Sequence, residues 1–129
     1  MTGLTPDRCP FCDLESGRVL EENELAIALL DAFPVSPGHT LVIPRRHIAD
    51  FFELSNEEMM AVLELLKRVH ARLMGGKRPD GFNVGINVGR AAGQTVSHAH
   101  VHLIPRFAGD VAQPRGGVRN VIPGKGVYV

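Results

Sequence analysis

Three histidines alternate with apolar residues in the run His98-Ala99-His100-Val101-His102. The chain has six histidines, so half of them fall within five residues, which argues against a chance arrangement. The β-branched Val101 and Ile104 and the closing Pro105 favour a strand. Successive side chains of a strand point to opposite faces, with a rise of about 3.3 Å per residue. The sequence therefore predicts that the three imidazoles line one face of a sheet.

Adjacent imidazoles suit two kinds of chemistry. The first is a metal-binding cluster, or simply a polar sheet face, because neutral imidazole is a common metal ligand. The second is nucleophilic catalysis, in which a neutral imidazole attacks phosphorus and forms a phosphoramidate intermediate. The neighbouring rings would then stabilise charge on the phosphoryl oxygens and protonate the leaving group.

Cys9 and Cys12 form a Cys-x-x-Cys pair near the start of the chain. Two cysteines this close together do not provide the disulfide framework of an exported fold. Metal binding is the first interpretation of the pair, and a pair of reduced thiols without metal is the alternative.

The elements that must position these residues are separated by Gly and Pro. Short apolar stretches rich in strand-forming residues predict five strands, at 18–22, 25–30, 40–43, 82–88 and 96–105. Phe33–Gly38 contains two prolines and a glycine, which predicts a hairpin turn between the second and third strands. Ser55 and Glu58 form a capping box, and apolar residues then recur at helical spacing as far as Gly75-Gly76. This pattern predicts one long helix.

Strands before and after one dominant helix predict an α+β fold, with an antiparallel sheet and the helix packed on one face. A chain of 129 residues forms one domain. Its 14 basic and 14 acidic side chains cancel, which argues against broad binding to nucleic acid or to anionic membranes. No apolar run is long enough to span a bilayer, and residues 1–10 lack the apolar stretch of a signal peptide, so a cytoplasmic location is expected.

The sequence resembles the histidine-triad family, whose signature of three histidines alternating with apolar residues matches His98 to Ile104. Further segments occur in the family's order: Cys9-Pro10-Phe11-Cys12, Leu29-Leu30-Asp31, Pro37 to Pro44, His47, Asn87 and Gly93-Gln94. The resemblance implies a sheet of about five antiparallel strands, one long and one short helix, and a two-fold homodimer with a continuous sheet. It also implies a domain over residues 1–106, with a Gly- and Pro-rich tail over 107–129 that belongs to it.

The family pattern assigns roles to individual residues of this chain. His100 would be the nucleophile that takes a nucleoside monophosphate, and His102 would contact the phosphate and its leaving group. Asp31 would bind ribose hydroxyls, although an Asp ahead of Pro34 also suits a turn cap. The other implied members of the nucleotide site are Phe11 and Leu29 as walls of the base pocket, either of which also suits the core, and Asn87, Gly93, Gln94 and Thr95 around the phosphate.

For relatives with Cys-x-x-Cys, the resemblance implies a structural zinc ion whose ligands here would be Cys9, Cys12, His47 and His98. Two thiolates and two imidazoles complete a tetrahedral set, so such a site leaves no open position for chemistry. The metal is therefore expected to fasten the N-terminal segment and to be remote in role from His100. No organic cofactor is expected, and His39 and His70 are interpreted as structural.

Two branches of the family compete for the substrate class. The chain lacks the tryptophan of the Hint-branch tail, and Pro105 to Asp110 resembles the Fhit branch, which splits dinucleoside polyphosphates. The tail, with Arg115, Arg119 and Lys125, either reaches polyphosphate across a dimer or is a surface arm. The resemblance thus implies an enzyme that cleaves the α-phosphate bond of purine nucleotides, as AMP or GMP derivatives, through nucleotidyl-His100. The alternative of another class is a nucleotide-binding sensor or adaptor without turnover.

Overall fold

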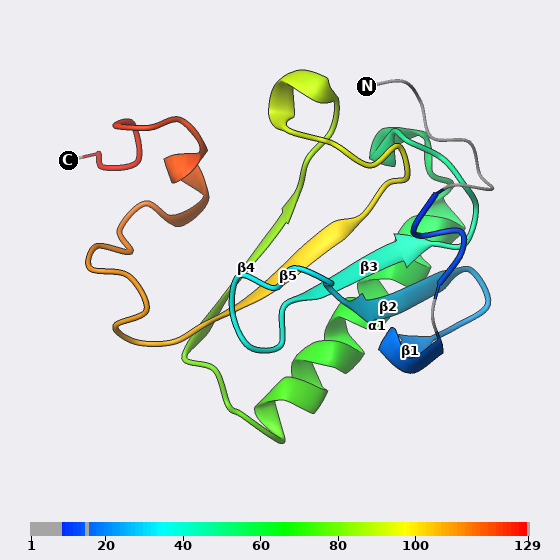
Figure 1. The fold of residues 1–129 in the computed structure, drawn as a ribbon, viewed down its shortest axis with the longest axis horizontal. Helices are drawn as coiled ribbons and strands as arrows, with labels where there is room; N and C mark the ends of the chain where they lie inside the picture. The colour runs from blue at the N-terminus through cyan, green and yellow to red at the C-terminus, as the bar shows by residue number, and fades with distance from the viewer. Residues whose placement is uncertain (1–8, 15, 129) are drawn as a thin grey trace.

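Five strands form one antiparallel sheet in the order β1-β2-β3-β5-β4 (Figure 1). The computed structural model describes residues 9–14 and 16–128. The strands are β1 Val19–Glu22, β2 Ala26–Leu30, β3 Thr40–Pro44, β4 Gly81–Ile86 and β5 Val101–Arg106. Every neighbouring pair in this order is antiparallel, so the predicted α+β class and its sheet are confirmed.

The hairpin between β2 and β3 carries the loop that leads to the site. The carboxylate of Asp31 accepts a hydrogen bond from the Phe33 N–H at 2.8 Å, which fixes the first turn of the loop. Gly38 has a φ of 89°, and a Cβ there would lie 2.8 Å from Cδ2 of Leu73 on the helix. A glycine therefore allows the close approach of hairpin and helix. The predicted hairpin is confirmed.

The helix α1, Asn56–Met74, begins with the predicted capping box. Ser55 Oγ accepts from the Glu58 N–H at 3.1 Å, and the Glu58 carboxylate accepts from the Ser55 N–H at 2.8 Å. Glu58 is buried, and the guanidinium of Arg46 donates to it at 2.7 and 3.0 Å. This ion pair ties the start of α1 to the segment after β3, which carries His47. The helix ends at Met74 and is followed by Gly75, as predicted.

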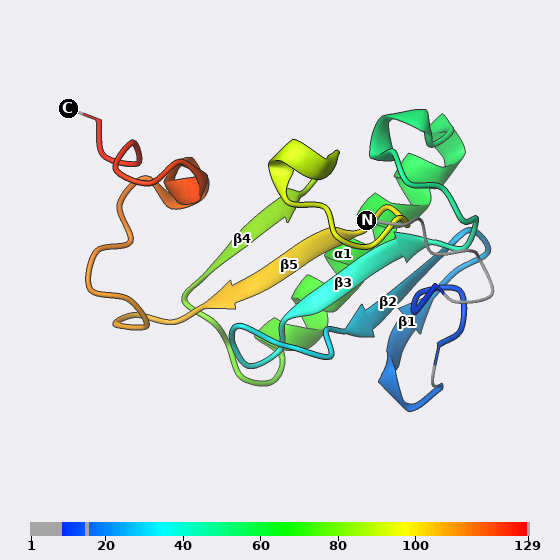
Figure 2. The ribbon, with the colours of Figure 1, turned by 45° about the horizontal axis from the view of Figure 1, so that its top comes forward.

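The sheet has an apolar cluster on each face, because side chains alternate along each strand. The cluster between the sheet and α1 consists of Ala26, Ala28, Val42, Ala61, Val62, Leu65, Val69, Val101 and Leu103. The cluster on the opposite face consists of Cys9, Phe11, Leu29, Leu41 and Ile43. Figure 2 shows α1 against one face of the sheet, so the second face is left for the histidines.

The strand β5 begins at Val101, not at residue 96, and the prediction of a strand over 96–100 is wrong. The chain bends at Val96–His98, and the Ala99 N–H donates to the Ile48 carbonyl at 2.7 Å. This contact with the segment after β3 takes the place of sheet pairing. Of the three histidines, only His102 therefore lies in the strand. β4 also ends earlier than predicted, at Ile86.

The one α-helix among residues 9–14 and 16–128 is α1. In place of the expected short helix, that part of the chain has 3-10 segments: η2 Ser16–Arg18, η3 Phe51–Glu53, η4 Arg90–Ala92 and η5 Gly117–Val121. No helix in the described ranges combines the length and apolar character needed to cross a bilayer.

The tail after Arg106, orange to red in Figures 1 and 2, runs out beyond the β4 edge of the sheet. Its η5 segment contacts β4. The guanidinium of Arg119 lies 4.6 Å from the centre of the Tyr128 ring and donates to the carbonyls of Lys125 and Gly126. The tail is thus held together by its own contacts, and these occupy Arg119.

Candidate functional site

His100 precedes β5, and its residue surface is only 8% exposed. Its Nδ1 lies 2.8 Å from the carbonyl oxygen of His98. A carbonyl oxygen only accepts, so we assign the proton of the neutral His100 ring to Nδ1. Nε2 then keeps a free lone pair, which is the form of imidazole that attacks an electrophile.

Nε2 of His102 carries a proton, whereas Nε2 of His100 carries a lone pair. The Val35 N–H donates to Nδ1 of His39 at 3.1 Å, so the proton of neutral His39 sits on Nε2. This Nε2 lies 3.0 Å from Nδ1 of His102 and 3.4 Å from the carboxylate of Asp31. His102 therefore accepts at Nδ1 and carries its own proton on Nε2. The ring centres of His100 and His102 are 5.1 Å apart, which places the Nε2 lone pair of His100 beside a ring that can donate.

Burial keeps the rings of His39 and His102 neutral. Desolvation lowers the pKa of His39 below its ordinary value, against an opposing effect of the Asp31 carboxylate. Desolvation also lowers the pKa of His102, with repulsion from His100 and His39 in the same direction and Asp31 opposing. The ordinary pKa of a histidine is about 6.5, so both rings are neutral at pH 7. The tautomers assigned above then apply.

Cys9, Cys12, His47 and His98 bring four ligand atoms to within 4.8 Å of one another, and we call this set the Cys–His clamp. Nδ1 of His98 lies 3.5 Å from the Cys9 sulfur and 3.6 Å from the Cys12 sulfur. Nδ1 of His47 lies 3.2 Å from the Cys12 sulfur. The other nitrogen of His98 donates to the Pro44 carbonyl at 2.8 Å, so the Nδ1 lone pair faces the thiols. This donor set fits a tetrahedral zinc ion.

Asp31, His39 and His102 also bring three ligand atoms to within 4.8 Å of one another, but their hydrogen bonds do not suit a cation. A neutral histidine that binds metal through Nε2 carries its proton on Nδ1. Nδ1 of His39 instead accepts from the Val35 N–H. The three residues therefore form a hydrogen-bonded chain that ends at His102.

Phe11, which lies between the two cysteines, borders His100. Its ring centre is 5.0 Å from that of His100, with the planes at 67°, and 5.9 Å from that of His98. Leu29 belongs to the same apolar cluster as Phe11 but has no exposed surface. Phe11 thus lies at the predicted site, whereas Leu29 lies in the core.

The loop between β4 and β5 carries the predicted phosphate-binding residues. Gln94 holds this loop together, because its Oε1 accepts from the Gly89 N–H at 2.9 Å and its Nε2 donates to two backbone carbonyls, at 2.9 and 3.1 Å. Gly93 has a φ of 95°, a conformation that favours glycine. Asn87 is half-buried and Thr95 is exposed. Gln94 therefore shapes the loop, and its side chain is already engaged.

His39 is the member of the candidate site that sequence reasoning missed, because it was interpreted as structural. It lies 63 residues before His102, and the two meet because β3 pairs with β5, with Leu41 opposite His102. That register could not be read from the sequence, so no sequence signal linked the two rings. Asp31 caps the turn at Phe33, which confirms the turn-cap interpretation, and it also contacts His39.

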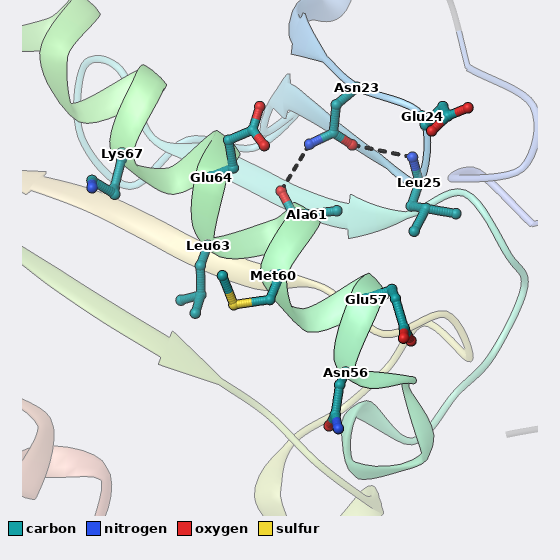
Figure 3. Close-up of a pocket in the computed structure, with 10 residues that line it drawn as sticks. All are labelled: Asn23, Glu24, Leu25, Asn56, Glu57, Met60, Ala61, Leu63, Glu64 and Lys67. Carbon is teal, nitrogen blue, oxygen red and sulfur yellow. Dashed lines mark hydrogen bonds between the residues drawn. The ribbon is translucent and has the colours of Figure 1, made fainter.

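A wide hollow of about 890 Å³ lies elsewhere, between the β1–β2 turn and the first half of α1 (Figure 3). Asn23 joins its two walls by donating to the Ala61 carbonyl at 3.0 Å and accepting from the Leu25 N–H at 3.1 Å. This hollow is on the α1 side of the sheet, whereas His100 packs against Phe11 in the opposite cluster. The chemistry of the side chains, more than the size of a hollow, therefore identifies the candidate site.

The HIT domain family profile matches residues 15–109, and the chain belongs to this family. An adenosine 5'-monophosphoramidase of Schizosaccharomyces pombe is 42% identical over 102 residues, which cover 76% of this chain and 74% of that protein. An AP-4-A phosphorylase of Mycobacterium tuberculosis is 35% identical over 107 residues, which cover 78% of this chain and 55% of that protein. The crystal structure of a zinc-bound histidine triad family protein from Mycobacterium smegmatis matches with a TM-score of 0.75 and 35% identity, covering 84% of this chain and 82% of that one.

Proposed function

We propose that this protein is a nucleotidyl hydrolase or transferase that cleaves the α-phosphate bond of a purine nucleotide through a covalent nucleotidyl-His100 intermediate. The observation that carries the proposal is the 2.8 Å hydrogen bond from His100 Nδ1 to the His98 carbonyl. It leaves the lone pair of His100 on Nε2, beside the donor of His102.

The reaction has two displacements at one phosphorus atom. Nε2 of His100 attacks the α-phosphorus and forms a P–N bond, while the bond to the leaving group breaks and its electron pair goes to that group. The Nε2–H of neutral His102 donates a hydrogen bond that stabilises charge on the phosphoryl oxygens and on the departing group, and it keeps its proton, so an amine leaving group takes its proton from solvent. Water, which releases a proton to solvent, or another acceptor then attacks phosphorus. The P–N bond breaks, and its electron pair returns to Nε2 of His100.

The nucleotide would be held by residues around this pair. Asp31 offers carboxylate oxygens that accept hydrogen bonds from ribose hydroxyls. In the Gly93–Thr95 loop, the N–H groups of Gly93 and Gln94 already donate to the carbonyls of Arg90 and Gly89, so these residues would shape the phosphate site. The exposed Thr95, and Asn87 directly after β4, would provide the contacts with phosphate. The ring of Phe11 provides an apolar wall for the purine, with Leu29 in the core cluster that supports it.

Two relatives support the choice of substrate class. One is named an adenosine 5'-monophosphoramidase and the other an AP-4-A phosphorylase. Both names describe adenylyl groups joined to a leaving group through the α-phosphate. We therefore propose AMP or GMP joined to an amine or to polyphosphate as the substrate of this chain.

Intact-protein mass spectrometry tests the proposal. Wild type and His100→Ala are mixed briefly with adenosine 5'-phosphoramidate or diadenosine tetraphosphate, and quenched without acid because the P–N bond is acid-labile. A transient AMP adduct in wild type alone is the expected result, and the donor with the faster turnover identifies the leaving group. AMP binding with neither adduct nor turnover would contradict the proposal and favour a sensor or adaptor.

We also propose that the Cys–His clamp holds zinc as a structural ion. Zinc would join the N-terminal turn to the segments that carry His47 and His98, and its closed ligand set would leave the chemistry to His100. Zinc binds thiolates, so the clamp suits a reducing compartment such as the cytoplasm. Metal analysis of the purified protein, with Cys9→Ser as the comparison, tests this assignment.

A two-fold homodimer with a continuous sheet is proposed for the same chain. β4 is an edge strand, and its Val84 and Ile86 side chains are 49% and 36% exposed. Antiparallel pairing of β4 with its copy would cover both side chains and satisfy the edge. Light scattering should give twice the mass of the chain for wild type, and the mass of one chain for Ile86→Lys.

A further inference from the structure

The turn between the two cysteines presents Phe11 to the nucleophile. The N–H groups of Cys12 and Asp13 both donate to the Cys9 carbonyl at 3.1 Å, which makes the turn tight. Phe11 at its centre is only 9% exposed and packs edge-on against the His100 ring. Because Cys9 and Cys12 flank Phe11 and belong to the clamp, the position of the Phe11 ring depends on how their sulfurs are held.

His98 provides a second connection between the clamp and the nucleophile. Its ring is fully buried, with Nδ1 toward the thiols and Nε2 donating to the Pro44 carbonyl. Its own backbone carbonyl is the acceptor that fixes the proton of His100. One residue therefore contributes a side chain to the clamp and a backbone group to the candidate active site. The expectation that the metal is remote in role from His100 remains a prediction, and this shared residue is the reason to test it.

We propose that metal binding at the Cys–His clamp and nucleotide binding at His100 are thermodynamically coupled, with Phe11 as the positioning residue that transmits the coupling. The inference rests on the proposed function, since it concerns the same nucleotide site. A filled clamp fixes the Cys9–Cys12 turn, so that the Phe11 ring is already in place against His100 when a nucleoside monophosphate arrives. Without the ion, part of the binding free energy of the nucleotide is spent on ordering this turn.

Coupling of this kind is reciprocal, which gives a readout that needs no catalysis. If the metal raises the affinity for AMP by some factor, AMP must raise the affinity for the metal by the same factor. Typical coupling between two sites is roughly 5- to 150-fold. We expect about tenfold here, because the turn is short and Phe11 is one of several contacts with the nucleotide.

The experiment measures the dissociation constant of AMP by calorimetry for zinc-loaded and metal-depleted wild type. It also measures the dissociation constant of zinc by chelator competition, with and without saturating AMP. Both constants should change about tenfold in wild type. Phe11→Ala should bind zinc as before, because Phe11 is not a ligand, but its two constants should be independent of each other. Leu14→Ala removes an apolar side chain from the same cluster and should keep the coupling of wild type.

A cobalt-loaded protein gives the same test in case the metal-free chain loses its fold, because the cobalt–thiolate absorption bands report how much metal stays bound. AMP should raise the chelator concentration that removes the cobalt about tenfold in wild type and in Leu14→Ala, and should not change it in Phe11→Ala. Equal AMP affinity with and without metal, together with a cobalt affinity that AMP does not change, would overturn the coupling and leave the proposed function standing. Coupling that persists in Phe11→Ala would overturn the role of Phe11. If zinc-loaded wild type does not bind AMP, both the proposed function and the coupling are overturned.

Discussion

Nε2 of His39 lies 3.0 Å from Nδ1 of His102, and the His39 ring is itself fixed by the Val35 N–H. Backbone geometry in the β2–β3 loop therefore decides which nitrogen of His102 carries the proton. A histidine outside the three-histidine signature thus determines which nitrogen of His102 can donate.

Removal of His39 should lower turnover more than it weakens substrate binding. His39→Leu leaves Nδ1 of His102 without its donor, so the required tautomer is no longer selected, and we expect kcat to fall roughly 10- to 100-fold. His39→Gln can still donate and should restore part of the loss. His70→Gln, on the exposed face of α1, is the control and should match wild type. Unchanged kcat in His39→Leu would show that His102 does not depend on this hydrogen bond.

Loss of a clamp ligand should destabilise the protein. Cys9 is buried in the clamp, so Cys9→Ser should lose the bound metal and lower Tm by about 10 °C, as expected when a structural ion no longer stabilises the fold. A chelator should lower the Tm of wild type by a similar amount and should not change that of Cys9→Ser. Equal metal content in the two proteins would contradict the assignment of Cys9 as a ligand.

The Arg46–Glu58 ion pair should make stability depend on pH. Arg46 lowers the pKa of the Glu58 carboxyl from 4.5 to about 2. Because the folded pKa is the lower one, the contribution of the pair is fully present above about pH 4.5 and is lost as the pH falls from there toward 2. Glu58→Gln should therefore cost about 2 kcal/mol at neutral pH and almost nothing near pH 2. Urea unfolding across this range, with the exposed Glu57→Gln as control, measures the difference.

Replacement of Asp31 should affect recognition of ribose. Asp31→Asn keeps an oxygen that can accept from the Phe33 N–H, so the turn should survive. Without the charged acceptor, we expect KM for a ribonucleotide substrate to rise about tenfold. The matching 2',3'-dideoxynucleotide lacks the hydroxyls, so its KM should be the same in wild type and variant. An equal rise for both substrates would show that Asp31 acts only on the loop.

The sequence predicted the parts of the fold that depend on local chemistry. The capping box at Ser55, the end of α1 before Gly75 and the turn before Thr40 all follow from residue types at short spacing, and the structure confirms each. The start of β5 was misplaced because a long-range hydrogen bond, from Ala99 to Ile48, replaces sheet pairing there. Local propensity contains no information about such a partner.

For the candidate site, the sequence predicted which residues take part better than it predicted the contacts between them. The clamp residues and His100 were predicted from spacing and from the family resemblance, and the structure brings the ligand atoms of the four clamp residues together. The proton positions, the role of His39 and the contact between Phe11 and His100 depend on strand register and on rings packed face to edge. These relationships exist only after the chain has folded.

Successive side chains of β5 point to opposite faces of the sheet, so neighbouring residues of this short strand belong to different parts of the protein. Val101 and Leu103 face the core beneath α1, while His102 between them faces the candidate site. A slip of one residue in the pairing of β5 would exchange these faces, placing an imidazole in the apolar core and apolar side chains among the reacting groups. A misregistered chain would thus be unstable and would lack the candidate site, so cellular proteolysis that removes unstable chains would also remove chains without the site.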